Sequence, residues 1–130
     1  MPQFRFMELE IWKDSISLNE KLFSLADEIS DAKSFRFAEQ LRAASLSISN
    51  NIAEGAGSYS DRDFANFLNI ARRSVFETAN LVFIAHQQNY IDTNCLNSLM
   101  LDLDVLSRKI SKLRMRLKKN EEKKNKDMAR

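Results

Sequence analysis

Basic side chains gather in the last quarter of the chain, where they could neutralise the phosphate groups of a nucleic acid. Residues 105–130 contain 11 lysines and arginines and 3 acidic residues, whereas residues 1–104 contain 9 and 15. The formal charge is therefore +8 in the C-terminal segment and −6 in the rest, although the whole chain carries only +2. Four of the basic residues follow the spacing of one helix face: Arg108, Lys112, Arg116 and Lys119.

Contacts between this basic stripe and phosphates would be independent of base sequence and would weaken steeply with added salt. A solvated helix face that ends in a soluble tail is the alternative, since lysine and arginine also suit the C-terminal end of a helix. The residues alone leave both interpretations open.

Nucleophilic and metal chemistry have little support. The only histidine, His86, and the only cysteine, Cys95, lie nine residues apart across an expected turn, with no third group to orient them. The Glu-x-x-His pairs of a helical di-metal site do not occur, and Asp102 and Asp104 would point to different sides of a helix. We therefore expect no enzyme, no catalytic residue, no metal site and no cofactor.

Apolar residues repeat every three to four positions in four segments, which predicts four amphipathic helices at about 7–29, 36–54, 61–87 and 93–118. Ser60, with Asp63 three residues later, and Asp92 or Thr93 are the expected N-caps. Gly55 or Gly57 is expected to end the second helix in the left-handed conformation.

Short loops between these helices predict an all-α, up-down-up-down four-helix bundle over residues 1–119. Residues 120–130 lack an apolar period, so a basic, disordered tail is expected there. The single cysteine suits a reducing compartment, and neither a signal region nor a membrane-spanning apolar run is present. These features predict a cytoplasmic protein with no membrane partner.

Several large apolar residues lie off the core stripes of their helices. A small monomeric bundle needs one apolar face per helix, so the surplus favours a homo-oligomer. Packing against the N-terminal arm or a wider core is the alternative. The candidate interface residues are Trp12, Ile16, Phe23, Phe76, Phe83, Leu101 and Val105.

The stretch 41–57 combines small residues, two asparagines, a glutamate and both glycines of the chain. It is best explained as a close-packed helix and its terminator. Glu54 opposes the helix dipole at this position, which calls for a partner such as Arg42, Arg72 or the backbone N–H groups near Ser60. A binding-site acid is the alternative role for Glu54.

The same stretch resembles the motif of the bacterial four-helix-bundle family named for proteins encoded by intervening sequences in 23S ribosomal RNA genes. The likeness rests on Leu41-Arg42-Ala43-Ala44 and Asn51-Ile52-Ala53-Glu54-Gly55-Ala56-Gly57, and it extends from Glu10-Ile11-Trp12-Lys13 to the turn Asn89-Tyr90-Ile91. We treat its motif residues as structural: Arg42, Asn51, Ile52, Ala53, Glu54 and Gly55.

The chain departs from the family pattern in two places that bear on function. Ser49 stands where proline is common, and Ser58-Tyr59 replaces a frequent basic pair after the second glycine. The loop after the second helix is therefore less positive than in many relatives.

The resemblance implies a ring-like homopentamer. It also implies similarity to the accessory protein of diversity-generating retroelements, a pentamer that binds reverse transcriptase and nucleic acid. The expected partners are thus further copies of the chain, RNA or DNA, and a reverse transcriptase or another protein. We interpret the chain as a non-enzymatic scaffold that binds phosphates through its C-terminal basic residues. The alternative is a protein–protein adaptor with no nucleic-acid role.

Overall fold

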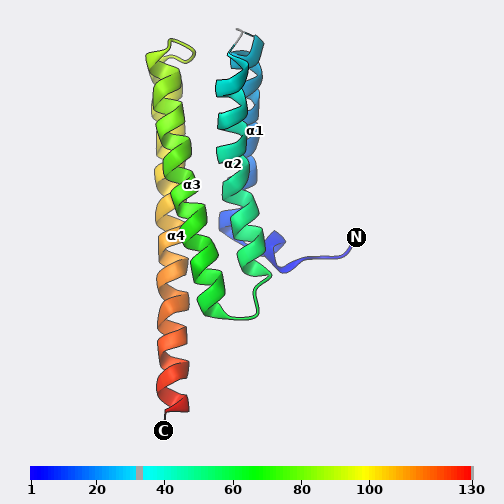
Figure 1. Ribbon diagram of the computed structural model, residues 1–130, viewed down its shortest axis with the longest axis vertical. Coiled ribbons are helices and arrows are strands. Elements are labelled where there is room, and N and C mark those ends of the chain that lie inside the picture. The colour runs from blue at the N-terminus through cyan, green and yellow to red at the C-terminus, as the bar shows by residue number, and fades with distance from the viewer. Residues whose placement is uncertain (32–33, 130) are drawn as a thin grey trace.

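The computed structural model describes residues 1–31 and 34–129, which fold into one short 3-10 helix and four α-helices. The 3-10 helix η1 spans Arg5–Glu8, and the α-helices are α1 (Glu10–Asp31), α2 (Phe35–Ala56), α3 (Asp61–Gln87) and α4 (Thr93–Met128). No strand occurs in these described ranges. The expected all-α four-helix architecture is confirmed (Figure 1).

The helices pack mainly against their neighbours in the chain. α1 lies on α2, α2 on α3 and α3 on α4, whereas α1 and α4 approach each other at only a few residues. Figure 1 shows α1 beside α2 and α3 beside α4, and α2 and α3 also pack on each other. The bundle is therefore loosely closed along the α1/α4 edge.

The core comes from the apolar stripes that the sequence predicts. Each helix contributes fully buried side chains, among them Leu22, Leu41, Leu68 and Ile110. Burying such a side chain contributes about 1.5–3 kcal/mol relative to leaving it in water. The apolar spacing therefore specifies both the helices and the faces by which they pack.

Two expected N-caps are confirmed. The Ser60 hydroxyl accepts a hydrogen bond from the Asp63 backbone N–H at 3.1 Å, and the Asp92 carboxylate accepts one from the Cys95 N–H at 2.8 Å. Each acceptor satisfies a backbone donor that the first helical turn leaves unpaired.

The expected left-handed glycine cap of α2 is wrong. Neither glycine has a positive φ, and Gly57 lies in the right-handed region at φ −81°. Gly55 is needed for space instead, because a Cβ there would lie 2.7 Å from the Phe67 Cβ and 2.9 Å from Phe64 Cδ1. The missing side chain lets the start of α3 cross close to the end of α2.

Arg5 of η1 supports this end of α2. Its guanidinium donates a 3.4 Å hydrogen bond to the Ala56 carbonyl and lies 5.3 Å from the centre of the Phe64 ring. A cation near the unpaired carbonyls of a helix C-terminus is favourable. The N-terminal segment thus stabilises the C-terminal end of α2, a role expected of a glycine cap.

The small residues of α2 allow polar contacts inside the bundle. Buried Asn19 of α1 accepts a hydrogen bond from Ser45 and donates one to Ser49 at 3.1 Å. On the other side of α2, the Ser47 and Ser74 hydroxyls are 2.8 Å apart. Short side chains bring α2 close to both neighbours and satisfy the buried polar groups there.

The expected disordered tail is helical. α4 runs 36 residues to Met128, so it is about 54 Å long, and its last turns extend beyond the other helices (Figure 1). The segment is rich in lysine and glutamate, which favour helix. Lys124 also forms a 3.6 Å ion pair with Asp61 at the start of α3, so the tail continues a helix that the bundle has already nucleated.

Candidate nucleic-acid interface

A groove lies between the N-terminal end of α1 and the C-terminal half of α4. Its volume is about 640 Å³. Three of the four predicted phosphate-binding residues line it together, and Lys109 joins them. The lining residues are Leu9, Glu10, Ile11, Lys109, Lys112, Leu113, Met115, Arg116 and Lys119.

The three predicted cations in the groove are available to an external anion. Lys112, Arg116 and Lys119 are exposed, and none of them forms an ion pair within the described part of the chain. Apolar Leu113 and Met115 lie between them. The groove therefore offers exposed positive charge beside apolar side chains.

Arg108, the fourth predicted residue, does not line this groove. Its Nε donates to Asp104 at 3.0 Å, one helical turn earlier. One expected member of the basic stripe is thus locally paired and separated from the other three.

Lys109 is the cation that the predicted stripe omits. Its ammonium lies 2.8 Å from carboxylate oxygens of both Glu10 and Asp14 on α1. Hydrogen bonds to Asp14 and then Glu10 raise the pKa of Lys109 well above its ordinary value. Lys109 thus holds the two helices together at the rim of the groove. Its spacing of three from Lys112 is the sequence signal that could have found it.

The same contact affects Glu10. The hydrogen bond from Lys109 and, to a smaller extent, the positive charge of Lys109 lower the pKa of the Glu10 carboxyl from its ordinary value of 4.5. A carboxyl group whose pKa is lower in the folded than in the unfolded chain stabilises the fold at pH values above the unfolded-state pKa. This stabilisation is lost as the pH falls through the lowered folded-state pKa. We expect Lys109→Gln to return the pKa of Glu10 towards 4.5, measured by an NMR titration of the carboxyl carbon. Lys112→Gln, in the same groove, should leave the Glu10 titration unchanged.

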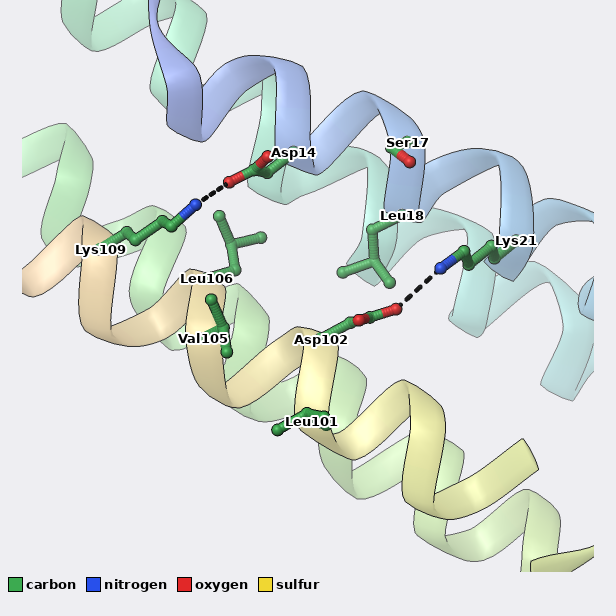
Figure 2. Close-up of a pocket in the computed structure, with 9 residues that line it drawn as sticks. All are labelled: Asp14, Ser17, Leu18, Lys21, Leu101, Asp102, Val105, Leu106 and Lys109. Carbon is green, nitrogen blue, oxygen red and sulfur yellow. Dashed lines mark hydrogen bonds and ion pairs between the residues drawn. The ribbon is translucent and has the colours of Figure 1, made fainter. Parts of the chain in front are cut away.

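A second groove of about 320 Å³ continues along the α1/α4 edge. Figure 2 shows Leu18, Leu101, Val105 and Leu106 between two ion pairs, Lys109–Asp14 and Lys21–Asp102, the latter 2.9 Å long. Leu101 is 63% exposed. This part of the edge combines apolar side chains with balanced charge, whereas the first groove carries a net positive charge.

The relationship of the chain to known proteins rests on its sequence. A profile of the family described as 23S rRNA-intervening sequence protein matches residues 7–112. The chain belongs to the 23S rRNA-intervening sequence protein family. The match ends within the basic stripe, so Arg116, Lys119 and the rest of α4 lie beyond it. No curated protein matches the chain.

A solved structure confirms the fold of this family member. The chain is similar to a protein of unknown function from the S23 ribosomal protein family of Bacteroides thetaiotaomicron, solved at 1.70 Å. The TM-score is 0.73 and the identity 24%, over 77% of this chain and 94% of the other. At this identity the likeness concerns the fold.

The 23S rRNA-intervening sequence motif has a structural explanation at most of its positions. Arg42 lies 2.6 Å from both Asp27 of α1 and Glu39, Asn51 donates to the Ser47 carbonyl at 2.8 Å, and Ile52 is fully buried. Half-buried Ala53 and Gly55 keep this end of α2 narrow.

Glu54 is the motif residue whose expected contacts are wrong. It is exposed, and neither Arg42, Arg72 nor a backbone N–H near Ser60 is its partner among the contacts of the described residues. The close approach of α2 and α3 at Gly55 determines this turn, and Glu54 remains a carboxylate open to solvent beside it.

The candidate interface residues of the family member do not share one surface. Trp12 packs on Phe6 with ring centres 5.0 Å apart, and Ile16 and Phe23 are also half-buried on α1. Leu101 and Val105 lie at the α1/α4 groove. Phe76 and Phe83 are exposed on α3. The N-terminal segment thus accounts for part of the surplus on α1, while the exposed residues fall in separate places.

The surroundings of His86 and Cys95 differ from those of a reactive Cys–His pair. His86 Nε2 lies 3.2 Å from the Thr93 hydroxyl, and burial raises the pKa of the Cys95 thiol, which disfavours the thiolate. Across residues 1–31 and 34–129, no three His, Cys, Asp or Glu side chains gather as metal ligands. None of the described helices could cross a membrane.

Proposed function

We propose that this 23S rRNA-intervening sequence protein is a non-enzymatic, cytoplasmic RNA-binding scaffold whose α1/α4 groove contacts backbone phosphates. The observation that carries the proposal is the placement of Lys112, Arg116 and Lys119 in one groove, where none of them has an ion pair with another described residue. Cations that are already paired would have to exchange a carboxylate for a phosphate, whereas these three would exchange only solvent and counterions.

The surroundings of the groove agree with an anionic polymer as ligand. Residues 105–130 carry a formal charge of +8, and α4 holds that charge on a rigid helix extending past the bundle. Phosphate contacts of this kind position a nucleic acid without reading its sequence. The family name, which refers to intervening sequences of 23S rRNA, favours RNA as the nucleic acid.

Self-association would strengthen such binding. A single groove with three available cations makes few phosphate contacts, but linked copies raise the effective concentration of each further groove. We propose a homo-oligomer because exposed apolar residues remain on α3 and α4, and a homopentamer because of the family resemblance.

The charge-balanced groove in Figure 2 favours a second candidate function. Leu101 and Val105 are exposed there beside balanced ion pairs, which suits a protein helix better than a phosphate backbone. A protein–protein adaptor would bind a partner at this groove and bind no RNA.

The proposal is tested by titrating the protein into a fluorescent, mixed-sequence RNA hairpin at several salt concentrations. We expect binding that is independent of sequence, with the logarithm of the association constant falling linearly with the logarithm of salt. A slope of about −2 or steeper corresponds to three phosphate contacts per chain. The absence of binding at low salt would contradict the RNA function and leave the adaptor.

A further inference from the structure

The basic groove between α1 and α4 contains apolar side chains as well as cations. Leu9, Ile11, Leu113 and Met115 are four of its nine lining residues, and Met115 is 57% exposed. An RNA duplex keeps its bases stacked inside and presents mainly phosphates and sugars to a protein. Such a ligand would engage the cations of the groove and leave the apolar side chains in contact with water. Phosphate binding alone therefore does not account for this groove.

An unpaired nucleotide has chemistry that complements both parts of the groove. Its phosphate is an anion, and its base has a free π face that can cover an apolar surface. Lys112, Arg116 and Lys119 are exposed, and none has an ion pair with another described residue. The groove volume of about 640 Å³ falls within the roughly 300–1,000 Å³ of small-molecule sites. The groove therefore has room for a base beside the cations that would hold its phosphate.

A second surface suited to a base lies on the loop between α2 and α3, at the end of the bundle from which α4 extends (Figure 1). Tyr59 in this loop is fully exposed, at 108%, so its ring adds nothing to the core. The 3.6 Å ion pair between Lys124 and Asp61 holds the end of the loop against α4, two residues after Tyr59. The Ser58-Tyr59 pair, which stands where many relatives have basic residues, thus supplies an exposed aromatic ring near the basic helix.

We propose that the RNA is single-stranded where this protein binds it. One base would lie on the apolar side chains of the groove, the neighbouring phosphates would meet its three cations, and a further base would stack on Tyr59. From Lys112 to Lys124, α4 rises about 18 Å, a distance that about five stacked nucleotides span at ~3.4 Å each. Because this assignment rests on the proposed RNA function, it names the class of RNA that the same site prefers. The unpaired loop of an RNA hairpin belongs to this class.

The preference distinguishes stacking from simple charge attraction. Duplexes have the higher charge density, so a surface that contacts only phosphates binds a duplex more tightly than a single strand. Cations combined with surfaces on which bases stack are typical of proteins that bind single strands without reading their sequence. A preference for the single strand would therefore require contacts to bases.

The test measures fluorescence anisotropy of two RNA probes at low salt. One is a mixed-sequence strand of about 12 nucleotides without self-complementarity, which exceeds the span of about five nucleotides along α4. The other is the blunt duplex formed by annealing that strand to its complement. We expect the strand to bind at least about 10-fold more tightly than the duplex, since only the strand has free bases.

Two substitutions remove the contacts to bases and keep every cation. Tyr59→Ala is expected to weaken binding of the strand by about 5- to 100-fold, the range for loss of one stacked base. Met115→Ser is expected to weaken it by about 3- to 10-fold through loss of apolar contact area. Both variants should weaken the duplex much less, whereas loss of a cation weakens both probes. Tyr59→Phe keeps the ring and should restore the strand affinity lost in Tyr59→Ala.

Two exposed apolar residues outside this surface provide matched controls. Leu101 on α4 is 63% exposed and lines the other groove, and Phe35 is 62% exposed at the opposite end of α2 from the Tyr59 loop. Leu101→Ser and Phe35→Ala should bind the strand like the wild type. Equal losses in these controls would mean that any exposed apolar residue matters, and the assignment would be overturned.

The remaining outcomes separate this assignment from the RNA function itself. The assignment alone is overturned if the duplex binds as tightly as the strand, or if either Tyr59→Ala or Met115→Ser binds the strand like the wild type. In those cases the groove still binds phosphates, and the RNA function stands. Failure of both probes to bind at low salt overturns the RNA function and this assignment together.

Discussion

Lys112→Glu/Arg116→Glu/Lys119→Glu is expected to weaken binding to a mixed-sequence RNA hairpin by about 10- to 100-fold at low salt and to flatten the salt dependence. Each phosphate contact releases nearly one counterion from the RNA. Loss of three contacts should therefore make the slope of log association constant against log salt less steep by about two to three. Fluorescence anisotropy across a salt series measures both quantities. All three residues are exposed, so the melting temperature should change little.

The matched control is Arg36→Glu/Arg62→Glu/Lys118→Glu. These residues are also exposed, lie outside the groove and have no ion pair in the described ranges. Each substitution changes the net charge by −2, so three substitutions take either variant from +2 to −4. Equal losses of affinity in the two variants would mean that overall charge and not the groove binds RNA, and our site would be wrong.

Gly55→Ala is expected to destabilise the protein by about 1–3 kcal/mol, although alanine is the better helix former. The added methyl group would lie 2.7 Å from the Phe67 Cβ, an atom fixed to the α3 backbone that no rotamer change can move. α2 and α3 would have to separate at their tightest crossing. Thermal unfolding at fixed protein concentration measures the loss, at about 2–5 °C per kcal/mol for a chain of this size.

Gly57→Ala is the control for this prediction. A Cβ at Gly57 would meet only backbone oxygens at 3.4 Å or more, and φ −81° is ordinary for alanine. Its unfolding free energy should stay unchanged or rise by up to about 1 kcal/mol. If Gly57→Ala proved the more damaging change, a capping role would return and our account of Gly55 would fail.

The helices could be predicted because their signals are local. Apolar residues at helical spacing and polar caps such as Ser60 and Asp92 act within a turn or two of the chain, so periodicity predicts four helices and their buried faces. The helical end of α4 could not be predicted from such local signals. A segment without an apolar face was expected to be disordered, but lysine and glutamate extend a helix that tertiary packing has already started.

The candidate site was predicted only in part. The spacing of the basic residues places Lys112, Arg116 and Lys119 on one face of α4, and they do line one groove. The same spacing includes Arg108, which pairs within its own helix, and omits Lys109, which pairs with α1. A pattern along one helix carries no information about which acids a distant segment brings near it.

The sequence by itself determined the four helices, their apolar faces, the N-caps Ser60 and Asp92 and the charged end of the chain, because each depends on residues within a few positions of one another. The tertiary structure decided why Gly55 is a glycine, which cations remain unpaired and where the exposed apolar residues lie. These outcomes depend largely on residues far apart in the chain, such as Gly55 with Phe67, which are 12 positions apart, and Glu10 with Lys109, which are 99 apart. Contacts of that kind exist only once the helices have packed.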